Sequence, residues 1–124
     1  MKIAITTNGT DLQSSLDPRF GRCPYFLLVD LETLECETTP NPGASAGGGA
    51  GIKAAQALTG LGAGALITGQ CGPNAYQILE AAGLRIMQAP VVSAREVIEM
   101  YKRGDLAPIN TPGGAHQGMQ GRVR

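Results

Sequence analysis

Two segments of this 124-residue sequence contain residue types that could bind a ligand. The first segment, residues 19–26, brings two arginines, one glycine and one cysteine into the five positions from Arg19 to Cys23. Guanidinium groups and glycine backbone N–H groups bind anions, so this segment could form part of an anion site. The alternative interpretation is a solvated loop with two surface arginines and a small buried cysteine.

The second segment is a glycine turn, residues 69–74, with Cys71 and Gly72 at its centre. It follows a short apolar strand and precedes Pro73, a residue type that favours the first position of a helix. The N–H groups of a helix N-terminus attract anions, and glycine lets a ligand approach the backbone closely. A thiol beside such a terminus has a lowered pKa, so Cys71 is predicted to be reactive or metal-ligating. The alternative is a small residue buried after a strand, and Cys36 is expected to be inert.

The residues that the chain lacks argue against several kinds of catalysis. His116 is the only histidine, and it lies in a segment expected to be a mobile tail, so neither a Ser-His-Asp nor a Cys-His arrangement can be built. The three cysteines have no CxxC spacing, and the ligands of a four-coordinate zinc site are missing. The first predicted strand has no carboxylate for two-metal catalysis. These absences indicate a binding protein and not an enzyme.

A glycine-rich run, residues 43–51, precedes the first predicted helix. It is not a P-loop, because no Gly-Lys-Ser/Thr follows it. It does not fit the dinucleotide-binding fingerprint either, because it follows a hairpin strand and not a parallel βαβ strand. The run is therefore either a second anion cradle or a flexible connection.

The charge and hydropathy of the chain limit its partners and its location. Ten basic residues balance ten acidic residues, so the chain has no overall positive charge for binding nucleic acid. No secretory signal is recognisable, and no apolar run approaches the roughly 18 residues of a membrane helix. Together with the unpaired cysteines, these features predict a cytoplasmic protein without a membrane or nucleic-acid partner.

The apolar patterns predict one α/β domain with a mixed five-stranded sheet flanked by helices. The expected strands are residues 2–7, 25–30, 35–39, 64–68 and 84–87. The expected helices are residues 52–58, 75–82 and 93–103, the last with a capping box formed by Ser93 and Glu96. The order β-β-β-α-β-α-β-α is also that of the ribonuclease H-like architecture. The domain is expected to span residues 1–104, followed by a disordered tail over 105–124.

Several motifs, in this order, resemble the dinitrogenase iron–molybdenum cofactor biosynthesis domain family. They are the opening residues 1–6, the segment from Asp17 to Phe26 with its Arg-Phe-Gly-Arg core, the glycine-led helix of residues 47–58 and the turn of residues 69–75. The resemblance covers about residues 1–103 and implies a ribonuclease H-like fold without nuclease activity. It also implies binding or carriage of an anionic iron–sulfur or molybdenum-containing metal–sulfur cluster, which is a large, soft anion.

The resemblance also assigns residues to this role and implies a partner. The cluster-binding residues that it implies are Arg19, Gly21, Arg22, Cys23, Cys71, Gly72 and Asn74, with Cys71 and Cys23 as metal ligands. The implied partner is a protein that donates or accepts the cluster, and we expect a monomer or weak dimer.

Two alternative functions remain open at the level of sequence. One is a module that binds a nucleotide or another phosphate-bearing ligand, and the other is a protein-interaction domain without a small ligand. Binding of a metal–sulfur cluster and binding of a nucleotide share one spatial condition. Residues near 20 and residues near 72 must meet at the same edge of the sheet, where open α/β sheets bind ligands.

Overall fold

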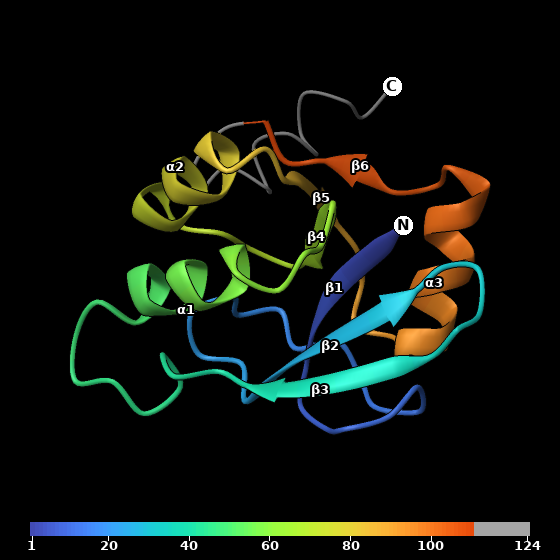
Figure 1. Cartoon of the computed structure of the whole chain (residues 1–124), viewed down its shortest axis with the longest axis horizontal. Coiled ribbons are helices and arrows are strands. Elements are labelled where there is room, and N and C mark those ends of the chain that lie inside the picture. The colour runs from blue at the N-terminus through green and yellow to red at the C-terminus, as the bar shows by residue number, and fades with distance from the viewer. Residues whose placement is uncertain (111–124) are drawn as a thin grey trace.

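The computed structural model describes residues 1–110 of the chain, which form one mixed sheet with helices on both faces (Figure 1). The elements in chain order are β1 (Lys2–Thr7), β2 (Tyr25–Asp30), β3 (Cys36–Pro40), α1 (Ala50–Thr59), β4 (Ala65–Thr68), α2 (Pro73–Ala81), β5 (Arg85–Gln88), α3 (Ala94–Arg103) and β6 (Ala107–Pro108). The predicted α/β class and the order of the first eight elements are therefore confirmed. None of the helices in this part of the chain is long and apolar enough to cross a membrane.

The sheet is organised around β1, which lies between an antiparallel and a parallel neighbour. The strand order is β3-β2-β1-β4-β5-β6. Ile3 is opposite Val29 in the antiparallel pair with β2 and opposite Ala65 in the parallel pair with β4. The chain direction therefore changes at β1, and the segments that leave the C-terminal ends of β1 and β4 start from adjacent strands. This is the position at which open α/β sheets bind ligands.

The alternation of side chains along the strands divides the core into two layers. Ala4, Phe26 and Leu66 belong to the cluster that includes the buried residues of α1 and α2. Ile5 and Ile67 belong to the cluster that includes the buried residues of α3. The central strands are buried on both faces, which explains why their sequences are continuous apolar runs without a polar alternation.

The ends of α3 show how local sequence sets the element boundaries. The Ser93 side chain accepts a hydrogen bond from the Glu96 N–H at 3.2 Å, as the predicted capping box requires. Gly104 ends the helix with φ 78°, a left-handed conformation that favours glycine. Lys102 and Arg103 lie in the last turn, where they interact favourably with the helix dipole.

The prediction of five strands is wrong, because the sheet has six. A sixth strand, β6, pairs antiparallel with β5, and Leu106 and Ile109 on either side of it are buried. The Tyr76 hydroxyl donates to the Asn110 carbonyl at 2.8 Å. A two-residue strand shows no periodic pattern, so sequence alone gave no signal for it. The predicted tail from residue 111 onward, including the solvated state expected for His116, lies outside the described residues.

We predict that Ile109→Ala lowers the free energy of unfolding by about 2–4 kcal/mol, because it leaves a cavity in the buried layer under α2. Urea unfolding followed by circular dichroism measures the change. Asn110→Ala is the matched control, because it removes an exposed side chain but keeps the carbonyl that binds Tyr76, and it should cost less than about 0.5 kcal/mol. Equal effects of the two substitutions would show that residues 105–110 are not part of the folded domain.

Candidate functional site

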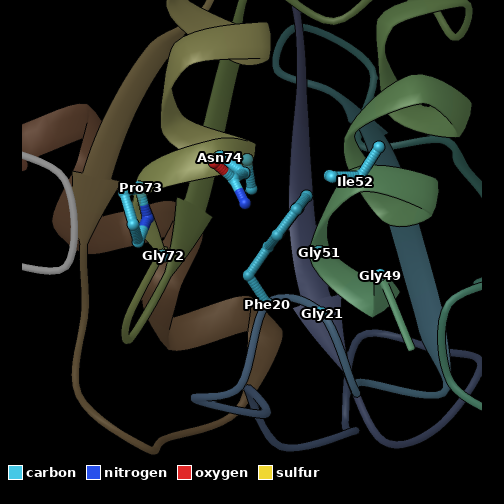
Figure 2. A pocket seen from close by; sticks show the side chains of 9 residues that line it. Phe20, Gly21, Gly49, Gly51, Ile52, Gly72, Pro73 and Asn74 are labelled. Carbon is cyan, nitrogen blue, oxygen red and sulfur yellow. The ribbon is translucent and has the colours of Figure 1, made fainter. Parts of the chain in front are cut away.

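A cavity of about 180 Å³ opens where three separate segments of the chain meet. The segments are the loop after β1, the turn between β4 and α2, and the start of α1 (Figure 2). The residues that line it are Phe20, Gly21, Gly49, Gly51, Ile52, Gly72, Pro73, Asn74 and Ala75. Three of the residues predicted to bind a ligand, Gly21, Gly72 and Asn74, are in this set.

The N-termini of two helices border this cavity. Gly49 is the N-cap of α1 and Gly72 is the N-cap of α2, and neither helix has a side-chain cap or an acidic residue in its first turn. Figure 2 shows the two helix starts on either side of Phe20. Free N–H groups and the positive ends of two helix dipoles therefore face one small space. Such an arrangement attracts an anion, because each terminus contributes roughly half a positive charge.

The loop after β1 and the turn after β4 are joined by backbone hydrogen bonds. The Gln70 N–H donates to the Pro18 carbonyl at 2.8 Å, and the Phe20 N–H donates to the Gln70 carbonyl at 3.4 Å. A Cβ on Gly69 would lie 2.6 Å from the Cβ of Pro18, so only glycine permits this approach. The prediction that residues near 20 and near 72 meet at one edge of the sheet is therefore confirmed.

Close packing of glycines places Gly21 against the first turn of α1. A Cβ on Gly21 would lie 3.0 Å from the nitrogen and 3.1 Å from the Cα of Gly51. A Cβ on Gly43, at the start of the glycine run, would lie 2.3 Å from the carbonyl oxygen of Ala50. Gly49 and Gly51 of the glycine run line the cavity, whereas Gly43 packs against the start of α1 outside the lining set.

Asn41 is a buried positioning residue that the sequence analysis missed. Its side-chain NH₂ donates to the carbonyl of Gly21 at 3.1 Å and to that of Cys23 at 2.8 Å. Its side-chain oxygen accepts from the Gly43 N–H at 2.8 Å. One side chain thus holds the Arg-Phe-Gly-Arg segment and the glycine run together. The available signal was an asparagine two residues before a glycine, which is typical of a turn in which the side chain accepts from the backbone.

Arg19 and Asp17 form an ion pair beside the cavity. Both carboxylate oxygens of Asp17 accept from the Arg19 guanidinium, at 3.0 and 2.8 Å, and one also accepts from the Arg19 backbone N–H at 2.9 Å. The side chain of Asp17 is 4% exposed and that of Arg19 is 64% exposed. The hydrogen bonds from Arg19 lower the pKa of Asp17 below its ordinary value. Arg19 is not among the residues that line the cavity.

Arg22 binds the glycine run and not the cavity. Its guanidinium donates to the Ala46 carbonyl at 2.7 Å and to the Ala44 carbonyl at 3.4 Å. The two predicted arginines therefore have different surroundings. Arg19 is held by a buried carboxylate, whereas Arg22 is exposed and bound to neutral carbonyls on a neighbouring loop.

The prediction that Cys71 has a lowered pKa is wrong. Cys71 is 1% exposed and Cys23 is fully buried, and burial raises the pKa of both thiols to about 12. The Cys23 thiol donates to the Phe20 carbonyl at 3.3 Å, and neither cysteine lines the cavity. Desolvation of the thiolate outweighs the nearby helix dipole. Within residues 1–110, no group of three His, Cys, Asp or Glu side chains is arranged to hold a metal ion.

The apolar part of the cavity wall was also not predicted. Phe20 is 2% exposed and stacks on Phe26 with ring centroids 5.8 Å apart, while Ile52 lies on the first turn of α1 opposite it (Figure 2). Phe20 lies between Arg19 and Gly21 in the sequence, outside any apolar run, so the sequence pattern did not predict that it is buried. The site thus combines an apolar wall with backbone N–H groups and has no ionised side chain among its lining residues.

The fold and this site define a small α/β domain with an anion-attracting cavity built from backbone. Residues 1–104 match the dinitrogenase iron-molybdenum cofactor family, and the chain belongs to it. This confirms the resemblance seen in the sequence and places the chain among domains associated with that cofactor's biosynthesis.

Three relatives show how closely the fold is shared. The apo form of the orange protein from Desulfovibrio gigas is 38% identical, with a TM-score of 0.85 over 90% of this chain and 94% of that chain. A proposed NifB protein from Thermotoga is 34% identical, with a TM-score of 0.78 over 89% and 94%. An uncharacterized protein of Methanocaldococcus jannaschii is 30% identical over 109 residues, 86% of this chain and 89% of its own length. The matched structures cover almost the whole described domain.

Cys36, which the sequence led us to expect to be inert, is the exposed cysteine, and we predict that it alone of the three reacts with a thiol reagent in the native protein at pH 8. Cys36 is exposed, whereas the other two thiols are buried and stay protonated far above this pH. Absorbance with Ellman's reagent should show one fast equivalent, and three after denaturation. A Cys36→Ser variant should lose the fast equivalent. A second fast thiol in native protein would contradict the burial of Cys23 and Cys71.

We predict that Asp17 makes stability fall in acid. Its folded pKa lies below its unfolded value of about 3.9, so its contribution is present above that value and is lost as the pH falls through the folded pKa. Urea unfolding between about pH 6 and pH 2 should show wild type losing more stability than Asp17→Asn. Asp11→Asn, at an exposed loop position, is the control. Parallel curves for wild type and Asp17→Asn would contradict the prediction.

Proposed function

We propose that this protein is a non-catalytic accessory protein that binds or carries an anionic metal–sulfur species. The observation that supports this most directly is the convergence of two uncapped helix N-termini on one cavity of about 180 Å³. Membership of the dinitrogenase iron-molybdenum cofactor family agrees with a ligand of this class. The orange protein structure is an apo form, which implies that this relative also has a ligand-bound form.

The chemistry of the lining residues determines which kind of cluster fits. Cys23 and Cys71 are buried and protonated, so we do not assign them as metal ligands. A cluster that needs protein thiolates would find no ligand set here. A thiometalate or mixed-metal sulfide whose own sulfur atoms complete the coordination fits better, because it needs only N–H donors and apolar contacts. Phe20, Ile52 and Ala75 provide such contacts for polarisable sulfur.

Three of the predicted binding residues act at the cavity in this proposal. Gly72 keeps the cavity open by having no side chain, and Asn74 contributes an N–H in the first turn of α2. Gly21 lets the loop after β1 pack against Gly51 and so shapes the cavity wall. Arg19 and Arg22 lie outside the lining set. Arg22 contributes positive charge near the cavity, whereas the charge of Arg19 is balanced by Asp17. The exposed mouth would allow transfer to or from a donor or acceptor protein.

The size of the cavity argues against the nucleotide alternative. Pockets for drug-sized ligands have volumes of about 300–1,000 Å³, well above the volume observed here. The cavity also has no charged side chain for a triphosphate. A protein-interaction domain without a small ligand is not favoured either, because such a role gives no reason for two bare helix N-termini to share one cavity.

We predict that the protein binds tetrathiomolybdate and that Gly72→Ala weakens this binding by about tenfold or more. A Cβ on Gly72 would meet no protein atom within 4 Å and would enter the space that the ligand needs. The φ of Gly72 is −69°, which alanine adopts without strain, so stability should change by less than about 0.5 kcal/mol. Visible absorption during titration measures the affinity.

Gly60→Ala, at the opposite end of α1, is the matched control and should bind like wild type. Molybdate and ATP should neither bind nor raise the melting temperature, whereas a ligand of the native state must raise it. No retained molybdenum in wild type, or equal affinities for Gly72→Ala and Gly60→Ala, would contradict the proposed site.

A further inference from the structure

Arg22 is an exposed cation next to the proposed anion site, and within residues 1–110 it has no acidic partner. In the described part of the chain the ion pairs are Arg19–Asp17 and Arg103–Asp105. Arg22 instead binds the carbonyl oxygens of Ala46 and Ala44, although it directly follows Gly21 in the cavity wall. Hydrogen bonds to an ionised acceptor are roughly twice as strong as those to a neutral one. An anion in the cavity would therefore compete for this guanidinium.

The loop that Arg22 holds is exposed at Ser45 and at the three glycines 47–49. Residues 44–49 extend away from the sheet as an arm that leads into α1 (Figure 1). At the base of this arm, Asn41 binds Gly43 and the Ala44 N–H. Further along the arm, a Cβ on Gly47, Gly48 or Gly49 would meet no atom within 4 Å. The guanidinium of Arg22 thus holds the middle of the arm in its outward position through the Ala44 and Ala46 carbonyls.

The far end of the same arm forms the rim of the cavity. Gly49 lines the cavity and is the N-cap of α1, with φ 67°. A movement of residues 44–48 therefore changes the access to the site. Because residues 47–49 have no side chains, their backbone N–H groups could approach a bound anion closely.

We propose that Arg22 is a ligand-operated latch on residues 44–49, which close over the bound anion. Without ligand, Arg22 binds the carbonyls of Ala44 and Ala46 and holds the arm outward. When an anion occupies the cavity, Arg22 transfers its hydrogen bonds to the anion, and the released arm closes over the mouth. The two states differ in the partner of one guanidinium, so the ligand shifts the population through its differential affinity. This inference rests on the proposed function and adds its regulation.

Limited proteolysis with elastase tests the latch, because the arm contains alanines at positions 44 and 46. In wild type, tetrathiomolybdate should slow cleavage within residues 44–50 by at least about fivefold. In the ligand-free protein, Arg22→Gln should speed this cleavage, because the arm has lost its tether. Its stability should remain within about 0.5 kcal/mol of wild type, since Arg22 is exposed.

The affinity for tetrathiomolybdate shows whether Arg22 also binds the anion or only holds the arm in place. Arg22→Gln should bind tetrathiomolybdate about tenfold more weakly, which corresponds to losing one charged hydrogen bond. Lys53→Gln, which removes an exposed positive charge from the first half of α1, should change affinity less than about twofold and should leave cleavage unaffected. Equal affinities of the two variants would overturn the latch.

The outcomes also distinguish the latch from the function on which it rests. If wild type binds tetrathiomolybdate but the ligand leaves elastase cleavage of the arm unchanged, the latch is wrong and the proposed function stands. If wild type does not bind tetrathiomolybdate at all, both proposals are overturned, and the titration alone shows this.

Discussion

The close backbone approach of the loop after β1 to its neighbours is the constraint on which the rest of this structure depends. Gly69 lets the β4–α2 turn pass against Pro18, and Gly21 packs on Gly51 at the start of α1. These contacts bring two helix N-termini to one place. A methyl group at Gly21 or Gly69 would separate segments that the cavity needs together, so the glycines act through geometry and not through ligand contact alone.

The sheet makes that approach possible because of its topology. β1 has an antiparallel hairpin on one side and parallel β4 on the other, so the segments after β1 and β4 leave from adjacent strands. The parallel connection then requires helices, and α1 and α2 lie together over one face of the sheet. Their N-termini consequently reach the edge where the loop after β1 crosses. The connectivity of the strands and helices brings the two helix N-termini together, so the site attracts anions without a charged side chain.

The sequence predicted those features whose causes are local. The Ser93–Glu96 capping box, Pro73 at the start of α2 and the apolar run of β2 each depend on neighbouring residues, and each is observed. The burial of Cys71 was not predictable in this way, because it depends on packing against distant residues of the core. The formation of β6 was not predictable either, because it depends on pairing with the edge strand β5.

The cavity is lined largely by backbone, so reasoning from reactive side chains identified segments that reach the cavity but not the atoms that line it. The two cysteines are in the right turns, yet their thiols pack inward with Phe26 and Leu79 while the backbone of the same turns faces the cavity. Desolvation makes a buried thiolate costly, whereas helix N–H groups need no ionisation to bind an anion. In the function that we propose, the ligand is bound through shape and partial charge, without a covalent bond to the metal. A carrier benefits from that chemistry, because a ligand held only by hydrogen bonds and apolar contacts can be released intact.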